Sequence, residues 1–151
     1  MACTVTKTVL IVDNNAFVRQ ALCELFARES DFAVCGDAEN GKEAVEKAQK
    51  LHPDLIVLDL SMPVMNGLNA ARVLKRLMPT VPLIMYSAFG DKSMEHQAQL
   101  IGISEVVSKS ENAQCADSQS TRSPLRHRRL TLQFYCAACS RQHRFTSSGA
   151  S

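Results

Sequence analysis

The sequence lacks any run of eighteen consecutive apolar residues, which excludes a conventional transmembrane helix. Its N-terminus, MACTVTKT, also lacks the long apolar segment of a secretory signal peptide. These two absences predict a cytoplasmic protein, in which the six cysteines are expected to be reduced rather than bridged. The apolar fraction of 46% is ordinary for a globular chain, and 151 residues suit one domain.

Lysine is absent after Lys109, and the composition changes at the same point. Residues 1–109 hold 11 basic and 13 acidic side chains, whereas residues 110–151 hold six arginines and two acids. We therefore predict a folded domain over residues 1–110. Residues 111–151 are predicted to form a basic Ser/Arg-rich tail that is disordered or loosely structured.

Two alternatives remain open for the tail. Cys136 and Cys139 with His143 have the spacing of half a zinc site, although no regular second pair of ligands follows. The arginines of residues 122–129 could bind an acidic partner, but no helix-turn-helix pattern is present, so nucleic acid binding is not expected.

Apolar strands alternate with helical patterns over the first 108 residues. Strands are predicted at 8–12, 32–35, 55–59, 83–86 and 105–108, and helices at 16–28, 40–51, 68–77 and 92–101. Asn40 and Glu43 have the spacing of a capping box at the start of the second helix. This alternation predicts an α/β fold with a doubly wound parallel sheet of five strands. No good pattern for a fifth helix follows, because residues 116–124 are almost devoid of apolar side chains.

Two acidic residues follow apolar strands directly: Asp13 after VLIV and Asp59 after LIVL. Parallel strands of an open sheet place their ligands beyond their carboxyl ends. Two acids at two such ends can hold one Mg²⁺ and leave one carboxylate free to attack phosphorus.

Four segments in residues 7–109 carry a family resemblance: VDNN after the first strand, LDLSMPVMNG after the third, YSA after the fourth and VVSK after the fifth. In their order and spacing they resemble the CheY-like receiver domain of bacterial two-component response regulators. The resemblance implies a flavodoxin-like strand order, 2-1-3-4-5. That order would bring Asp13, Asp59, Ser87 and Lys109 to one edge of the sheet.

The resemblance also implies a role for each of these residues. Asp59 would be the phosphoacceptor, Ser87 the switch hydroxyl and Lys109 the contact to the phosphoryl oxygens. The implied magnesium ligands are Asp13, Asn14, Asp59 and the backbone carbonyl of Ser61.

The chain departs from the family pattern at three positions. Asn14 stands where the family has a second acid, and it offers a carbonyl oxygen without a charge. Val106 replaces the aromatic residue that commonly partners the switch hydroxyl, and Ser110 replaces a proline. The loss of one acid predicts weaker Mg²⁺ binding.

The leading interpretation is a phosphoacceptor receiver of a two-component phosphorelay, whose partner is a sensor histidine kinase or a phosphotransfer protein. It would not be an enzyme apart from Mg²⁺-dependent self-phosphorylation and self-dephosphorylation. A homodimer through the face of the fourth helix and fifth strand is a further expectation. The alternatives are a pseudo-receiver that only binds partners and a truncated or frame-shifted regulator without an output domain. A phosphatase is disfavoured, because Ser61 occupies the place of its second aspartate.

Overall fold

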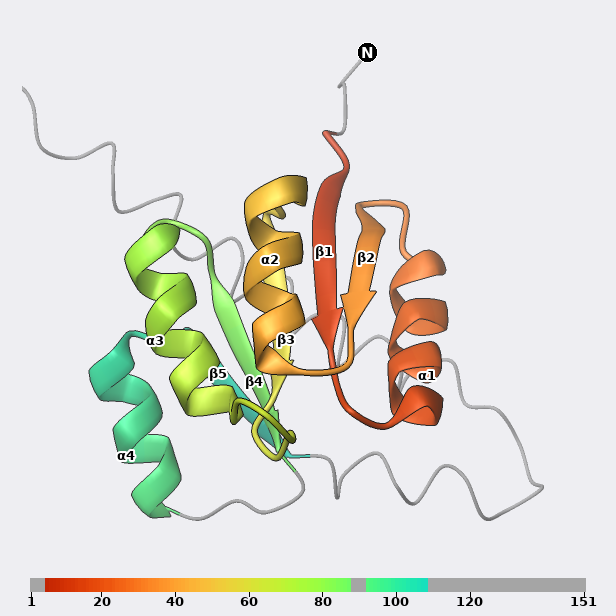
Figure 1. Ribbon diagram of the computed structural model, residues 1–151. Helices are drawn as coiled ribbons and strands as arrows, with labels where there is room; N and C mark the ends of the chain where they lie inside the picture. Colours follow the sequence, from red (N-terminus) through yellow and green to blue (C-terminus); the bar gives the residue numbers. More distant parts are fainter. Residues whose placement is uncertain (1–4, 88–91, 109–151) are drawn as a thin grey trace, which may run out of the picture.

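The computed structural model describes residues 5–87 and 92–108, except for the side chains of Ser87, Lys92 and Ser108. In chain order the elements are β1 (Lys7–Val12), α1 (Ala16–Ala27), β2 (Phe32–Ala38), α2 (Gly41–Leu51), β3 (Leu55–Asp59), α3 (Gly67–Leu77), β4 (Leu83–Ser87), α4 (Lys92–Ile101) and β5 (Glu105–Ser108) (Figure 1). No helix among these is long and apolar enough to cross a membrane. The prediction about a fifth helix concerns residues that follow Lys109, and these lie outside the described ranges.

The five strands form one parallel sheet in the order β2-β1-β3-β4-β5, which confirms the predicted doubly wound, flavodoxin-like fold. The central strands β1 and β3 are buried on both faces, as expected for runs of branched aliphatic residues. The chain leaves β1 toward β2 on one side and returns to β3 on the other. The carboxyl ends of β1 and β3 therefore flank the switch point of the sheet, where such folds bind their ligands.

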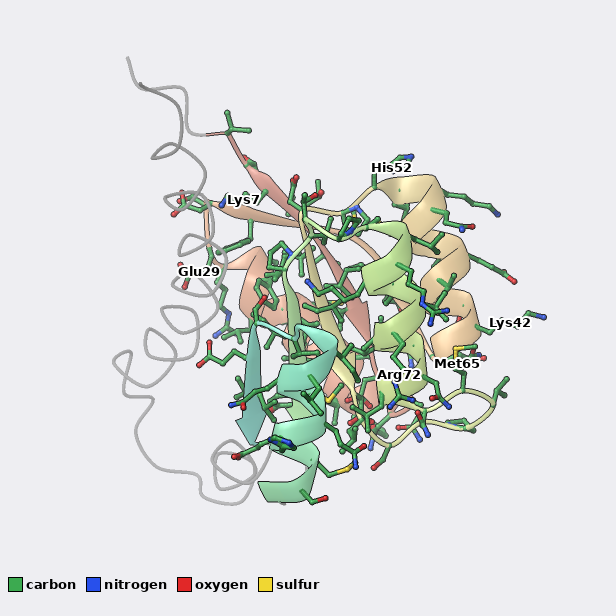
Figure 2. The ribbon with its side chains drawn as sticks, turned by 90° about the vertical axis from the view of Figure 1, so that its left-hand side faces the viewer. Lys7, Glu29, Lys42, His52, Met65 and Arg72 are labelled. Carbon is green, nitrogen blue, oxygen red and sulfur yellow. The ribbon has the colours of Figure 1, made fainter. Side chains whose placement is uncertain are left out.

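Side chains that alternate along the strands form two separate cores. Helices α2, α3 and α4 cover one face of the sheet, where Leu10, Leu58 and Met85 lie in the larger core (Figure 1). Figure 2 shows α2 and α3 on that side, with Lys42 pointing away from the sheet. Helix α1 packs on the opposite face, where Phe26 meets Phe32 edge to face at 5.5 Å between ring centroids.

An asparagine caps each of the first three helices where it leaves the carboxyl edge of the sheet. The side-chain oxygens of Asn15, Asn40 and Asn66 accept hydrogen bonds from backbone N–H groups in the first turns of α1, α2 and α3. These caps fix the points at which the loops from β1, β2 and β3 enter the following helices.

The predicted end of the second strand is wrong. We expected the strand to stop at Cys35, before Gly36, but β2 continues to Ala38. The pairing with β1 shifts between Val9 and Leu10, so a bulge at Cys35 lets the strand continue past the glycine. The extension matters because it places Asp37 and Ala38 beside the end of β1.

Candidate functional site

Asp13 and Asp59 lie side by side at the carboxyl edge of the sheet. Val12 of β1 pairs with Leu58 of β3, and each acid is the next residue along its strand. Neighbouring strands lie about 4.8 Å apart, so the main chains of Asp13 and Asp59 lie close together. Both are buried, with 0% of Asp13 and 3% of Asp59 exposed. The structure therefore brings together the two acids that the sequence singled out.

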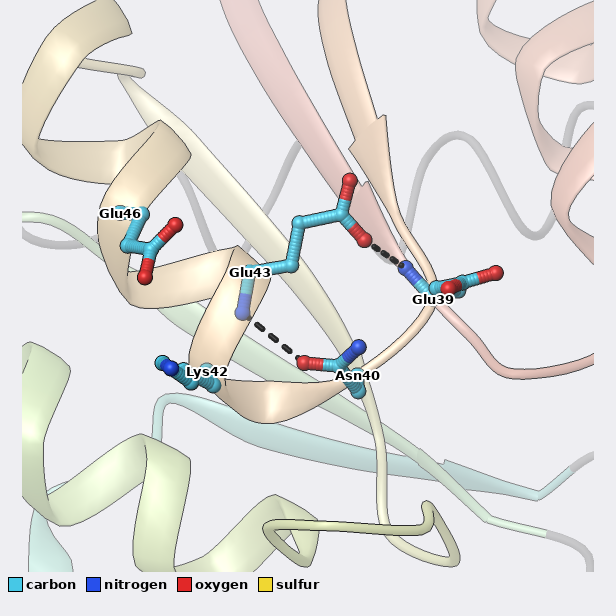
Figure 3. Close-up of a pocket in the computed structure, with 5 residues that line it drawn as sticks. All are labelled: Glu39, Asn40, Lys42, Glu43 and Glu46. Carbon is cyan, nitrogen blue, oxygen red and sulfur yellow. Dashed lines mark hydrogen bonds between the residues drawn. The ribbon is translucent and has the colours of Figure 1, made fainter.

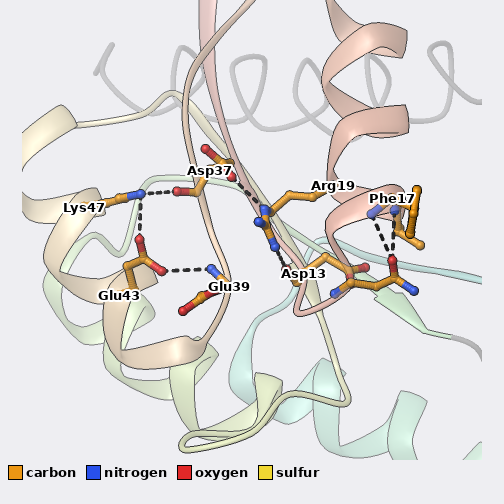
Figure 4. Close-up of polar contacts among 9 residues, drawn as sticks. Asp13, Phe17, Arg19, Asp37, Glu39, Glu43 and Lys47 are labelled. Atoms are coloured by element: carbon orange, nitrogen blue, oxygen red, sulfur yellow. Dashed lines mark hydrogen bonds and ion pairs between the residues drawn. The ribbon is translucent and has the colours of Figure 1, made fainter.

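Several hydrogen bonds hold Asp13, and Figure 4 shows the one that it accepts from Arg19. Its N–H donates to the Ala38 carbonyl at 3.1 Å, and its Oδ1 accepts from the Asn15 N–H at 2.8 Å. Its carbonyl oxygen accepts a hydrogen bond from Nη1 of Arg19 at 2.8 Å. The main chain of Asp13 is therefore fixed from β2 and from α1 at once.

Asn14 and Ser61 lie at the same edge but are exposed. Asn14 directly follows the buried Asp13, and Ser61 lies two residues beyond Asp59. Exposure leaves the Asn14 side chain accessible to a ligand at this edge. It does not place either residue in contact with the two carboxylates.

The loop from β3 to α3 packs tightly against Asp59. Its Met62 and Met65 side chains pack into the larger core. The Gly67 N–H donates to the Leu60 carbonyl at 2.9 Å. A Cβ atom on Gly67 would lie 2.2 Å from the Asp59 carbonyl oxygen, which is far closer than atoms can approach. Glycine is thus required where α3 begins against the backbone of Asp59.

Val64 lies at the tip of the same loop in a strained conformation. Its φ is +69°, and the Met65 N–H donates to the Pro63 carbonyl at 2.7 Å across it. A tight γ-turn with positive φ is rare, and a β-branched residue fits it poorly. Because 83% of Val64 is exposed, little packing compensates for the strain.

Replacing Val64 by glycine should raise the free energy of unfolding by about 1 kcal/mol, since glycine adopts positive φ without a steric penalty. The Val64→Ala variant keeps a Cβ atom and should gain less. Urea denaturation of the three proteins measures the difference. Equal or lower stability of the Val64→Gly protein would contradict the strain argument.

Ser87 ends β4, and its backbone pairs with Ser108 at the end of β5. This pairing brings the Ser87 main chain to the edge that carries Asp59, because Asp59 pairs with the preceding Tyr86. The Ser87 side chain and the whole of Lys109 lie outside the described residues, so their predicted roles stay predictions.

Polar side chains from β2 and α2 continue the network next to Arg19 (Figure 4). Nε of Arg19 pairs with Asp37 Oδ2 at 2.6 Å, and Nζ of Lys47 contacts both the Asp37 carbonyl and the Glu43 carboxylate. The Glu39 N–H and then Lys47 hold the pKa of the Glu43 carboxyl below its usual value. The pair of Arg19 and Asp37 could not be predicted from the sequence, because the two residues lie 18 positions apart along the chain.

A surface hollow at the start of α2 is lined by Glu39, Asn40, Lys42, Glu43 and Glu46 (Figure 3). The Glu43 N–H donates to Oδ1 of Asn40, as the predicted capping box requires. The Glu43 carboxylate, however, accepts from the N–H of Glu39 instead of that of Asn40. The hydrogen bonds of Glu39, Asn40 and Glu43 therefore stabilise the start of α2.

The donor set at the edge of the sheet suits Mg²⁺, which prefers oxygen ligands and keeps several waters. The two buried carboxylates of Asp13 and Asp59 and the side-chain amide of the exposed Asn14 provide such oxygens. Within the described ranges, no cluster of three acidic, histidine or cysteine side chains could hold a metal. The chemistry of the two acids fits a magnesium ion that keeps several waters.

Fold and site together define a receiver-type signalling domain. Residues 9–116 match the model of the response regulator receiver domain, and the chain belongs to this family. Receiver domains act in two-component signalling and chemotaxis, and Mg²⁺ binding and phosphorelay are standard for them.

The chain is 43% identical over 105 residues to a protein-glutamate methylesterase/protein-glutamine glutaminase 1 of Methanosarcina acetivorans. That match covers 68% of this chain but 30% of the relative. This chain is also 38% identical over 103 residues to the chemotaxis protein CheY of Thermotoga maritima. That match covers 68% of this chain and 85% of CheY. The chain thus spans less than a third of the first relative and most of the second.

Among solved structures, the chain resembles the response regulator domain of Thermotoga maritima CheB. The TM-score is 0.73 at 29% identity, and the match covers 88% of this chain and 96% of that domain. The fold is also similar to a chain in the CheX–CheY–BeF₃–Mg²⁺ complex of Borrelia burgdorferi, with a TM-score of 0.70 at 22% identity over 87% of this chain and 90% of that one.

Proposed function

We propose that this receiver domain accepts a phosphoryl group on Asp59 from a phosphohistidine of a sensor histidine kinase or a phosphotransfer protein. The observation that supports the proposal most directly is the pair of buried carboxylates on neighbouring strand ends. One of them, Asp13, is fixed by its neighbours, whereas the other ends β3 next to the tightly packed Gly67 loop.

The transfer is a displacement at phosphorus. A carboxylate oxygen of Asp59 forms a P–O bond while the P–N bond to the donor imidazole breaks. The imidazole nitrogen keeps the electron pair of the broken bond and takes up a proton from solvent. The product is an acyl phosphate on Asp59, and no oxidant or further reactant is needed.

Asp13, Asn14, Asp59 and the Ser61 carbonyl would hold the Mg²⁺. When bound, the ion neutralises the charge on the phosphoryl oxygens. Asp13 provides the fixed negative charge that attracts the cation, and Lys109 would balance the phosphoryl oxygens from the other side. Ser87 would turn toward the phosphoryl group and report its presence to the α4–β5 face, where a homodimer could form.

The domain would act as a switch and not as an enzyme with an external substrate, although slow Mg²⁺-dependent self-dephosphorylation belongs to this mechanism. A cytoplasmic location is part of the proposal, because sensor kinases present their phosphohistidine there.

A second candidate is a pseudo-receiver that binds partners without phosphorylation. Asn14 favours this candidate, because it leaves the edge of the sheet with one acid fewer than the family pattern. Weak Mg²⁺ binding would then stop the transfer while the fold stays intact.

The test is the intact mass of the full chain after incubation with acetyl phosphate, with Mg²⁺ or with a chelator. We expect one phosphoryl adduct that needs Mg²⁺. The Asp59→Asn protein should carry none, because an amide is not a nucleophile toward phosphorus. A folded wild-type protein without an adduct at any Mg²⁺ concentration would favour the pseudo-receiver. An adduct that persists in the Asp59→Asn protein would refute the assignment of the site.

A further inference from the structure

Arg19 links the carboxyl end of β2 to Asp13, the residue that directly follows β1. It lies on α1, and only 18% of its side chain is exposed. Nε donates to Asp37 Oδ2 at 2.6 Å, while Nη1 donates to the Asp13 carbonyl at 2.8 Å (Figure 4). One guanidinium therefore bridges a carboxylate at the end of β2 and the main chain at the end of β1.

The end of β2 holds Asp13 by two routes. Ala38 accepts a hydrogen bond from the Asp13 N–H directly, and the preceding Asp37 acts through Arg19 on the Asp13 carbonyl. Both backbone groups of Asp13 are thereby restrained. A further contact, from the Asn15 N–H to Oδ1 of Asp13, orients the carboxylate itself.

We propose that Arg19 is a positioning residue for the metal site: its bridge from Asp37 to the Asp13 carbonyl sets the Asp13 carboxylate for Mg²⁺. The inference rests on the proposed function, because it assumes that Asp13 is a magnesium ligand. Groups that orient a metal ligand commonly change metal affinity by a factor of about ten or more when they are removed.

The positive charge of Arg19 would by itself weaken Mg²⁺ binding, whereas its positioning of Asp13 would strengthen it. A cation near an acidic site repels Mg²⁺, so removing it should tighten binding if charge alone matters. Removing a positioning residue should weaken binding instead. The sign of the change therefore separates the two roles.

The shape of the side chain gives a second distinction. A guanidinium donates to two acceptors in a fixed planar fork, whereas a lysine ammonium is a flexible point charge. The Arg19→Lys variant keeps the charge but loses the fork. If the bridge positions Asp13, Arg19→Lys should bind Mg²⁺ nearly as weakly as Arg19→Met.

The experiment is a calorimetric Mg²⁺ titration of the unphosphorylated full chain, with the melting temperature of each variant measured alongside. Lys47→Met is the matched control, because Lys47 contacts Asp37 and Glu43 but not Asp13. We expect an approximately tenfold weaker Mg²⁺ affinity for Arg19→Met and Arg19→Lys, and no change for Lys47→Met. The half-saturating Mg²⁺ for acetyl phosphate labelling should rise in parallel, while the rate at saturating Mg²⁺ stays near that of the wild type.

Three results would overturn the inference: tighter or unchanged binding in Arg19→Met, wild-type binding in Arg19→Lys, or an equal loss in Lys47→Met. If Arg19→Met does not fold, Arg19→Lys and Asp37→Ala carry the test, since Asp37→Ala removes one end of the bridge and should weaken binding by a smaller factor. A wild-type chain that binds no Mg²⁺ would instead refute the proposed function.

Discussion

Replacing Gly67 by alanine is expected to destabilise the domain by about 3 kcal/mol, at the upper end of what an added methyl group costs in a packed site. The new Cβ atom would lie 2.2 Å from the Asp59 carbonyl oxygen and 2.8 Å from the Leu60 Cα. Both neighbours are backbone atoms, so no side chain can rotate to make room. The start of α3 or the end of β3 must therefore move, and a movement at the end of β3 displaces Asp59.

Gly36→Ala is the matched control for this prediction. Its added Cβ atom would also meet a close neighbour, at 2.8 Å, but that neighbour is the end of the Leu51 side chain. Leu51 is partly exposed and can turn away, so the change should cost less than about 1 kcal/mol. Urea denaturation gives both values, and acetyl phosphate labelling of the folded fraction shows whether Asp59 is displaced. Similar stabilities for the two variants would contradict the argument from backbone contact.

The regular elements of this fold could be predicted because each depends on its own residues. Apolar runs such as VLIV and LIVL are typical of parallel strands that are buried on both faces. Asparagine caps mark the first residue of a helix from the local sequence alone. Predicted element boundaries agree with the structure within one residue for most elements. The end of β2 is the exception, because a bulge opposite Val9 and Leu10 depends on the partner strand and not on the local sequence around Gly36.

The site could be predicted in part. Asp13 and Asp59 stand out because each follows an apolar strand, and parallel pairing of β1 with β3 brings them together. The strand order that makes those two strands neighbours came from the family resemblance. Arg19 could not be found in this way, since its partner Asp37 is 18 residues away and reaches it only through the extended β2. The strain at Val64 was equally invisible, because φ depends on how the loop closes over Pro63 and Met65.

Replacing Asn14 by aspartate should tighten Mg²⁺ binding by about ten- to hundredfold, because the number of charged ligands strongly tunes the affinity of oxygen sites for divalent cations. Asn14 follows Asp13 and is exposed, so an added carboxylate there incurs little desolvation. Without metal, the new charge repels the nearby acids and should lower stability. The melting temperature of the Asn14→Asp protein should therefore respond more strongly to Mg²⁺ than that of the wild type.

Asn15→Asp provides the control for added charge. It changes the net charge by the same amount at the next residue, but the Asn15 side chain accepts hydrogen bonds from the Phe17 and Val18 N–H groups as the cap of α1. Aspartate is an equally good cap, so this variant should fold with its carboxylate turned toward the helix and gain little Mg²⁺ affinity. Calorimetric titration of the two variants distinguishes a direct ligand from general attraction. An equal gain in Mg²⁺ affinity at both positions would show that added charge alone raises the affinity. It would contradict the prediction that an aspartate at position 14 is a direct ligand.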